Sequence, residues 1–228
     1  MTTEQRTALI TGANRGLGRA VAAELLARGL RIVVTARDEA EAAATARELG
    51  PEVRWAALDV TDQQSVDAAR KAIGPVDILV SNAGVLLDSG SDPLSVSLDL
   101  VRQTFSVNLL GSWRVAQAFV PDMVRRRWGR VVLVSSGTGS FSHGLFAGSP
   151  GYSVSKTAVN GLTQLLAGQT KDYGVLVNAV NPGPTRTRMM PGAQRTAEEA
   201  ARDVADAATL PDGGPTGTFR RGEQVFDW

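Results

Sequence analysis

The 228-residue chain has no cysteine and a single histidine, His143. The lack of cysteine excludes disulfides, thiolate catalysis and cysteine-ligated metal sites. A lone histidine excludes a histidine-cluster metal site, and any Ser-His-Asp triad would depend on that one side chain. We therefore expect no metal centre in this protein.

The chain also lacks a dominant charge and a long apolar run. Its 24 Lys and Arg residues against 23 Asp and Glu residues give a net charge of +1, which is too balanced for a general nucleic-acid or membrane surface. The first residues, MTTEQRTALI, do not form the apolar stretch of a signal peptide, and no run approaches the length of a membrane span. We expect a soluble, cytoplasmic protein that binds neither nucleic acid nor membrane.

The stretch from Thr7 to Gly18 (TALITGANRGLG) combines a short apolar strand, three glycines and the start of a helix. A strand that enters a helix through a glycine turn is how α/β folds bind phosphate. The N–H groups at such a helix N-terminus are unpaired, and the macrodipole there favours negative charge. The spacing is G-x-x-x-G-x-G, and by itself it equally fits a plain strand-to-helix connection.

Apolar strands and helices alternate along the chain, which predicts a parallel sheet with helices on both faces. We expect a capping box of Thr61 and Gln64, and a long helical region over about 98–127 with a break near Gly111 and Pro121. Because there is no linker or internal repeat, residues 1–228 are predicted to form a single-domain, doubly wound α/β Rossmann fold. Strands are expected at 8–10, 32–34, 53–58, 76–80, 130–134 and 175–180, a seventh near 218–219, and an extension near 224–226.

In such a sheet, ligands bind beyond the carboxyl ends of the strands. Arg37 follows the second strand, where an arginine accommodates the 2′-phosphate of NADP and an acid would bind the ribose of NAD. Arg15 in the glycine turn is a second candidate for that phosphate, although both arginines also fit a solvated surface. Asp38 competes as the ribose acid, but a helix N-cap suits it better. The sequence favours NADPH over NADH.

Other strand ends carry polar or small residues with two interpretations each. Asp59 follows the third strand and either accepts from an adenine amino group or serves as a turn residue. Asn82, Ala83 and Gly84 follow the fourth strand and either let the backbone pass close to a ribose or form a turn.

Tyr152 and Lys156 are four residues apart at the start of a predicted helix, so they share one helix face. The ammonium would favour phenolate and so lower the pKa of the tyrosine from its ordinary value of about 10. A serine hydroxyl aimed at the same point could hold a substrate carbonyl oxygen, and a hydride acceptor requires such polarisation. Alone, the two residues also fit an ordinary surface pair.

The motifs gain meaning from their order: TGANRGLG (11–18), Asp59, NAG (82–84), Asn108, Ser136, YSVSK (152–156) and NPGPTRT (181–187). In this order the chain resembles the short-chain dehydrogenase/reductase family over essentially its whole length. The stretches TGANRGLG, IVVTARD (32–38) and LPDGGPTGTF (210–219) are similar to the NADPH-dependent carbonyl reductase branch.

The resemblance implies that Tyr152 is the general acid, that Lys156 binds the nicotinamide ribose, and that Ser136 orients the carbonyl. It implies that Asn108 supports a water that relays protons to Lys156, and Ser135 remains the alternative serine. A seven-stranded, mainly parallel sheet of order 3-2-1-4-5-6-7 is expected. The implied cofactor contacts are Gly12, Asn14, Arg15, Gly16, Leu17, Gly18, Arg37, Asp59, Val60, Asn82, Ala83, Gly84, Tyr152, Lys156, Pro182, Gly183, Thr185 and Thr187.

An apolar wall for a hydrophobic ketone or aldehyde is expected from five residues, which equally fit a lid that never touches substrate: Phe141, Leu145, Phe146, Met189 and Met190. His143 lies in the same loop and is expected at the surface rather than on substrate. The segment after Thr187 is short, which predicts an open cleft. The resemblance also implies a homodimer or homotetramer built on the helices at 98–127 and 152–170.

We therefore predict an NADPH-dependent oxidoreductase (EC 1.1.1 type) that reversibly reduces a ketone or aldehyde to an alcohol. The alternative is a catalytically silent NADP(H)-binding sensor or scaffold of the same fold. A hydrolase that uses Ser136 and His143 is excluded, because the chain has no G-x-S-x-G turn and the serine lies in a loop.

Overall fold

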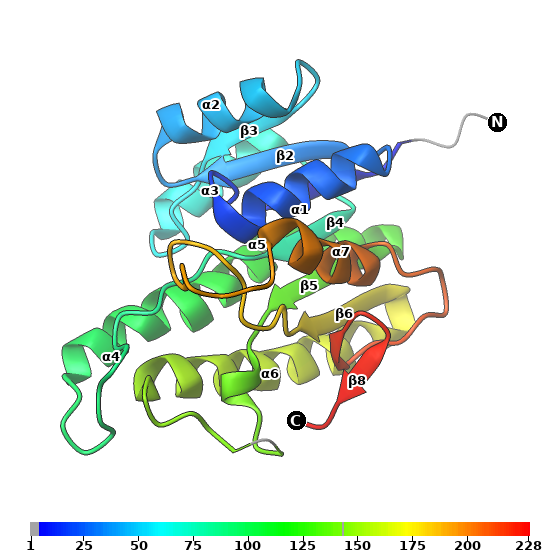
Figure 1. Ribbon diagram of the computed structural model, residues 1–228. Coiled ribbons are helices and arrows are strands. Elements are labelled where there is room, and N and C mark those ends of the chain that lie inside the picture. Colours follow the sequence, from blue (N-terminus) through cyan, green and yellow to red (C-terminus); the bar gives the residue numbers. More distant parts are fainter. Residues whose placement is uncertain (1–4, 143) are drawn as a thin grey trace.

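A computed structural model describes residues 5–142 and 144–228, so the expectation for His143 lies outside the described residues. Its centre is one sheet of order β3-β2-β1-β4-β5-β6-β7-β8 (Figure 1). The predicted order 3-2-1-4-5-6-7 is confirmed, and these seven strands are parallel. The strands are β1 Thr7–Ile10, β2 Arg31–Ala36, β3 Arg54–Ala57, β4 Ile78–Ser81, β5 Gly129–Val134, β6 Val175–Val180, β7 Phe219–Arg221 and β8 Gln224–Phe226.

The predicted extension is an eighth strand, which the expected seven-stranded sheet did not include. β8 pairs antiparallel with β7, because only two residues, Gly222 and Glu223, separate the two strands. Gly222 has a φ of +55°, a conformation that a two-residue hairpin requires and that glycine adopts without strain. The hairpin therefore closes the sheet at the edge beyond β6.

Helices cover both faces of the sheet (Figure 1). Along β1, Leu9 packs with α3, α5 and α6, whereas its neighbours Ala8 and Ile10 pack with α1, α2 and α7. This alternation follows from the two-residue period of a strand and explains why every residue of β1, β4, β5 and β6 is buried. The helices are α1 Gly16–Ala27, α2 Glu39–Leu49, α3 Gln63–Ile73, α4 Leu98–Phe105, α5 Ser112–Arg126, α6 Pro150–Thr170 and α7 Ala197–Ala208.

The long region over 98–127 is divided once rather than twice. A π-helical segment, η1 (Ser106–Gly111), separates α4 from α5, so the break expected near Gly111 is present. Pro121 lies inside α5 without ending it. A proline in a helix interior costs about 3 kcal/mol, but the neighbouring Phe119 and Met123 are fully buried in the core and hold the helix in place.

The capping box expected from Thr61 and Gln64 is wrong. The N-cap of α3 is Asp62, whose carboxylate accepts a hydrogen bond from the Gln64 N–H at 3.0 Å. Thr61 instead donates both its N–H and its hydroxyl to the Asp59 carboxylate. A charged carboxylate is a stronger hydrogen-bond acceptor than a hydroxyl. The Asp62 carboxylate therefore takes the capping position, and the Asp59 carboxylate holds Thr61 away from it.

In the part of the chain that the structure describes, no helix is long and apolar enough to cross a membrane.

Candidate active site

A cleft of about 1360 Å³ runs along the carboxyl ends of strands β1 to β6. It forms there because the loops after the parallel strands diverge at the point where the strand order reverses. All of the predicted cofactor contacts line it, as does Ser136 among the predicted catalytic residues. The residues predicted to contact the cofactor therefore gather at one cleft, although they come from segments that lie far apart in the chain.

The glycine turn after β1 is built to bring backbone close to a ligand. Gly12 and Gly16 have φ values of +62° and +52°, which side-chain-bearing residues rarely adopt. A Cβ on Gly18 would lie 2.4 Å from the Gly12 carbonyl oxygen and 2.5 Å from Asn82 Nδ2. The N-cap of α1, Arg15, makes no side-chain capping bond. The first N–H groups of α1 thus remain available for a pyrophosphate.

Asn82 holds this turn in place. Its Nδ2 donates to the carbonyl oxygens of Thr11 and Gly12 at 2.9 and 3.1 Å. The Thr11 hydroxyl in turn accepts from the N–H groups of Asn82 and Ala83 at 3.0 Å. Asn82 therefore lies in the cleft, as expected, and also ties the loop after β4 to the loop after β1.

Arg15 and Arg37 are both exposed and both line the end of the cleft beside β2. Asp38 is the N-cap of α2 and accepts from the Glu41 N–H at 2.9 Å, so its expected capping role is confirmed. Sequence reasoning missed Glu41, which lines the same end and accepts a hydrogen bond from Asn14 Nδ2 at 2.6 Å. This end of the cleft therefore holds a mixed set of charges.

Asp59 lies at the same end and is ionised more easily than an ordinary aspartate. Burial alone would raise its pKa, but hydrogen bonds from Thr61 and the positive charges of Arg37 and Arg114 outweigh burial and lower the pKa. Its Oδ1 accepts from the Thr61 N–H at 2.8 Å and from the Thr61 hydroxyl at 2.7 Å. Asp59 is thus a charged acceptor beside β3.

Tyr152 and Ser136 meet at the other end of the cleft. Tyr152 lies in the first turn of α6, and the side chain of Ser136 lies near enough to its hydroxyl to oppose the rise of its pKa. Ser135 does not share this role, because its hydroxyl is buried and donates to Asn160 Oδ1 at 2.6 Å. The structure therefore brings Ser136, the serine favoured by the resemblance, to the tyrosine.

The expected lowering of the Tyr152 pKa by Lys156 is wrong in this structure. Burial raises the pKa of Tyr152 to about 12, and the nearby Ser136 side chain opposes that rise only in part. Lys156 Nζ lies 5.6 Å from the centre of the tyrosine ring and donates to the Val134 carbonyl oxygen at 2.7 Å. Burial lowers the pKa of Lys156 to about 8. Desolvation, which sequence spacing does not reveal, dominates both groups.

Asn108 is buried behind the cleft, within the π-helical segment η1. Its Oδ1 accepts from the Val85 N–H at 2.8 Å, and its Nδ2 donates to the Val85 carbonyl oxygen and to Ser155 Oγ. Ser155 Oγ donates to the Tyr152 carbonyl oxygen at 2.7 Å. Asn108 therefore connects the loop after β4 to the turn that carries Tyr152 and Lys156, but it does not itself line the cleft.

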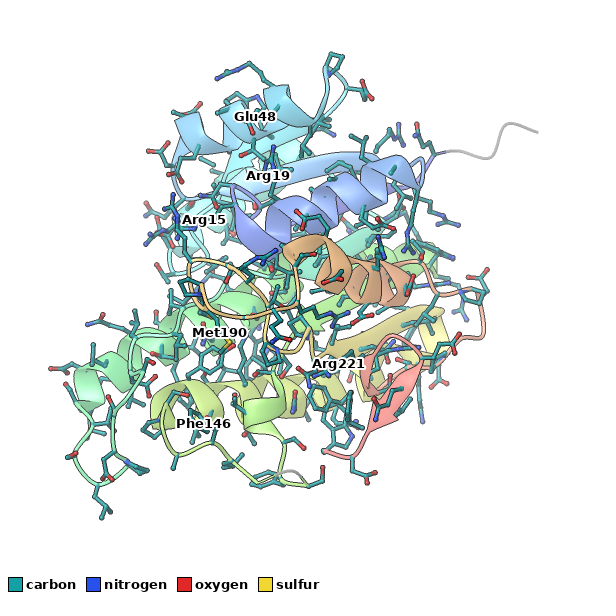
Figure 2. All side chains as sticks on the ribbon, viewed as in Figure 1. Arg15, Arg19, Glu48, Phe146, Met190 and Arg221 are labelled. Carbon is teal, nitrogen blue, oxygen red and sulfur yellow. The ribbon has the colours of Figure 1, made fainter. Side chains whose placement is uncertain are left out.

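The apolar wall is present in part. Phe146, Met189 and Met190 line the cleft, while Phe141 and Leu145 are exposed and lie outside its lining. Figure 2 shows Phe146 and Met190 coming from separate segments, before α6 and after β6 respectively. The sequence offered no means of separating the two groups, since all five side chains are large and apolar and stand in loops.

Asp88 is a residue that sequence reasoning missed. It is 1% exposed, and its carboxylate accepts from the N–H groups of Gly151 and Tyr152 in the first turn of α6. Ser149, the N-cap residue of α6, makes no side-chain capping bond. Asp88 therefore caps α6 from the loop that follows β4 and holds the turn that presents Tyr152.

We expect Asp88→Asn to lower the free energy of unfolding by about 1–2 kcal/mol, because the helix N-terminus loses a charged acceptor. Urea denaturation measures the change. Asp92→Asn is the matched control: Asp92 is exposed in the same loop and its carboxylate accepts from the Leu94 N–H within that loop, so we expect a change below about 0.5 kcal/mol. Equal effects of the two substitutions would contradict the capping role.

Arg221 is a second residue that the sequence analysis missed. It ends β7 and lines the cleft beside the loop after β6 (Figure 2). The signal for it is the rule that ligands lie beyond the carboxyl ends of parallel strands, which holds for the seventh strand as for the first six.

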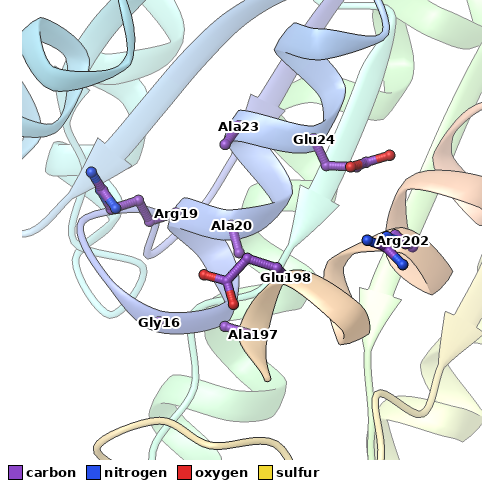
Figure 3. A pocket seen from close by; sticks show the side chains of 8 residues that line it. All are labelled: Gly16, Arg19, Ala20, Ala23, Glu24, Ala197, Glu198 and Arg202. Atoms are coloured by element: carbon purple, nitrogen blue, oxygen red, sulfur yellow. The ribbon is translucent and has the colours of Figure 1, made fainter. Parts of the chain in front are cut away.

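A smaller hollow of about 320 Å³ lies between α1 and α7 (Figure 3), and Tyr152 is not among the residues that line it. Its charged side chains alternate in sign, Arg19 and Arg202 against Glu24 and Glu198. Arg19 points toward α2, where it pairs with Glu48 at 2.9 Å. With balanced charge and no nucleophile, acid or base beyond its surface carboxylates, this hollow is the weaker candidate for a functional site.

A glycine turn at a helix N-terminus and a Ser-Tyr-Lys cluster beyond the same sheet are the features that a nucleotide-dependent oxidoreductase requires. Residues 6–198 match the family described as "short chain dehydrogenase", and the chain belongs to this family.

Two curated relatives illustrate the similarity. The 3-oxoacyl-(acyl-carrier-protein) reductase FabG of Vibrio harveyi is 36% identical over 214 residues, covering 92% of this chain and 82% of the relative. The oxidoreductase UcpA of Salmonella typhimurium is 37% identical over 197 residues, covering 81% and 71%.

Solved structures agree on the fold. A 3-oxoacyl-(acyl-carrier-protein) reductase of Brucella melitensis with bound NAD has a TM-score of 0.85 at 27% identity, covering 96% of this chain and 89% of that one. ElxO with NADP bound has a TM-score of 0.85 at 25% identity, covering 94% and 96%. The family thus includes members with either dinucleotide, and the chain is an oxidoreductase of this family with a dinucleotide-binding fold.

Proposed function

We propose that the protein reduces a ketone or aldehyde to an alcohol with NADPH, in the manner of the carbonyl reductases that it resembles. The observation that carries this proposal is the contact between Tyr152 and Ser136, beside the buried Lys156, in the cleft that the glycine turn also lines. Relatives named as 3-oxoacyl reductases act on a ketone by their name, which supports a carbonyl substrate.

In this mechanism the dinucleotide, when bound, supplies the hydride. The Tyr152 hydroxyl donates its proton to the substrate carbonyl oxygen, and Ser136 donates a hydrogen bond that orients the same oxygen. Because burial keeps the pKa of Tyr152 at about 12, the phenol holds its proton at neutral pH and can act as an acid.

Different residues of the cleft would bind different parts of the cofactor. Free N–H groups of α1 and the glycines at 12, 16 and 18 bind the pyrophosphate, and Asp59 accepts from the adenine amino group. Lys156 binds the nicotinamide ribose, and the backbone from Pro182 to Thr185 meets the carboxamide. These roles come from the family resemblance and agree with the lining of the cleft.

Preference for NADPH rests on Arg15 and Arg37, with Glu41 as an opposing charge at the same end. We expect Arg37→Ala to reduce the ratio of kcat/KM for NADPH over NADH roughly 10- to 100-fold, because a charged hydrogen bond to the 2′-phosphate is lost. Arg31→Ala is the control, since Arg31 is exposed at the opposite end of β2. An unchanged ratio in Arg37→Ala would remove Arg37 from the phosphate site.

A panel of ketones and aldehydes, run with NADPH and with NADH, tests the proposed function. We expect oxidation of NADPH with at least one apolar ketone or aldehyde. Tight binding of NADPH without turnover of any compound would instead favour the alternative, a silent cofactor-binding sensor or scaffold.

A further inference from the structure

Arg221 lies beside the catalytic end of the cleft. β7 runs parallel to β6 with Val180 opposite Arg220, so the next residues, Asn181 and Arg221, are neighbours at the carboxyl ends of the two strands. Asn181 also lies against the loop after β5: its Nδ2 lies 3.0 Å from the position of a Cβ on Gly137. Asn181 therefore lies between Gly137, the residue after Ser136, and Arg221.

The guanidinium of Arg221 is held in place but not neutralised. Its Nε donates to the Asn181 carbonyl oxygen at 3.2 Å, and its Cζ lies 5.5 Å from the centre of the Phe226 ring. The group packs so closely on Gly183 that a Cβ there would lie 3.0 Å from Nη2. Among the described residues, no carboxylate lies within ion-pair distance of Arg221. Most of its N–H donors are thus free to bind a ligand.

The charges that line the cleft are divided between its two ends. The carboxylates among the described lining residues, Asp38, Glu41 and Asp59, all follow β2 or β3. Beyond β5 to β7, the charged lining residues are cations: Lys156, Arg188 and Arg221.

The buried Asp88 does not offset these cations, because its carboxylate binds the N–H groups of Gly151 and Tyr152 and does not line the cleft. Around Tyr152 the cleft therefore combines positive charge with the apolar side chains of Phe146, Met189 and Met190. This combination fits an amphiphilic ligand with a negative end.

We propose that the substrate is a carbonyl compound with an apolar body and an anionic group, a carboxylate or a phosphate, which Arg221 binds while Tyr152 protonates the carbonyl oxygen. Arg188, exposed on the rim, adds attraction to the same group. Arginine suits this task because its planar fork of donors matches the oxygens of both anions. The inference rests on the proposed function and specifies its substrate class.

Three substrates that share one aryl ketone test the proposal: the keto acid, its methyl ester and the corresponding keto phosphate. We expect the wild-type protein to reduce at least one anionic compound with a kcat/KM at least 10-fold above that of the ester. In Arg221→Gln this kcat/KM should fall roughly 10- to 100-fold, mainly through KM, because a charged hydrogen bond is lost. The ester should change less than 3-fold, and Arg221→Lys should retain part of the preference.

The control variant is Arg186→Gln, since Arg186 is exposed in the loop after β6 but does not line the cleft. Its kinetics should match the wild type on all three compounds. A keto phosphate that depends more strongly on Arg221 than the keto acid does identifies phosphate as the anion, and the reverse result identifies carboxylate.

Each of the following results would overturn the inference. An equal loss on acid and ester in Arg221→Gln would make Arg221 a support for the turn at 181–183. A change confined to the KM of NADPH would place Arg221 on the cofactor. A wild-type protein that reduces the ester as well as both anions would show no anion site, while the proposed function would stand. If none of the three compounds is reduced, the wider panel is decisive: turnover of neutral carbonyls alone overturns the anionic class, and no turnover at all overturns the proposed function too.

Discussion

Tyr152→Phe should abolish carbonyl reduction and leave NADPH binding intact. The phenylalanine keeps the ring and its packing but lacks the proton that must reach the carbonyl oxygen. General acid catalysis contributes about 10²- to 10⁴-fold, so we expect kcat to fall by about 10³-fold or more. Stopped-flow or steady-state oxidation of NADPH measures kcat, and fluorescence titration of NADPH measures the dissociation constant.

Tyr173→Phe is the matched control, because Tyr173 is the other tyrosine of the chain and lies outside the cleft lining, near Arg127. Its kcat should equal that of the wild type. Near-native turnover in Tyr152→Phe would remove the tyrosine from the mechanism. If Tyr152→Phe lost both NADPH binding and turnover, the substitution would be disturbing the first turn of α6.

Lys156→Met should abolish turnover and stabilise the fold at neutral pH. Lys156 is 4% exposed, and burial lowers its pKa from 10.5 to about 8. At pH 7 the ammonium is charged in both the folded and the unfolded protein, and only the folded protein must hold it away from water. The difference in pKa corresponds to a cost of about 3 kcal/mol, which methionine removes.

The substitution also has a cost of its own. Lys156 Nζ donates to the Val134 carbonyl oxygen at 2.7 Å, and losing this bond costs about 1 kcal/mol. We therefore expect the variant to be more stable than the wild type by about 2 kcal/mol at pH 7.

The stability difference between the wild type and Lys156→Met should also change with pH, in a direction that the burial cost of the ammonium determines. As the pH rises from about 8 toward 10.5, the folded wild type has lost the proton while the unfolded chain still holds it, so wild-type stability rises and the advantage of the variant shrinks. Above about pH 10.5 the wild type should be the more stable of the two. Urea denaturation at pH 7, 9 and 10.5 measures this course, with the exposed Lys171→Met as control. A difference that does not change with pH would contradict the assigned burial cost.

Sequence patterns predicted the sheet well because each strand carries its own evidence. β6 is a continuous apolar run whose predicted bounds of 175–180 match the structure, and the buried residues on both faces of β1 follow from parallel pairing. Helix capping was predicted less well than the strands. Asp62 rather than Thr61 caps α3, since two candidate acceptors stand side by side and their contacts decide between them.

The chemistry of the site divides in the same way. The spacing of Tyr152 and Lys156 places them on one face of α6, and this is a local property of a helix. Their pKa values depend instead on how much water the surrounding protein excludes. For this reason the Tyr152 pKa is raised, although the helical spacing alone predicted that Lys156 would lower it. The large, apolar side chains of Phe141 and Leu145 likewise do not reveal whether the loop that carries them turns them into the cleft or away from it.

The sequence by itself determined the fold class, which follows from short-range rules: a glycine turn before a helix, apolar strands, and a helical spacing of four. The strand order and the proposed cofactor contacts came from the family resemblance, which the same residues carry. Only the tertiary structure showed that Asp88 holds the turn of Tyr152, and that Arg221 brings an unneutralised charge to the catalytic end. Both residues act across long separations in the chain, and such contacts are fixed by packing rather than by any pattern of neighbours.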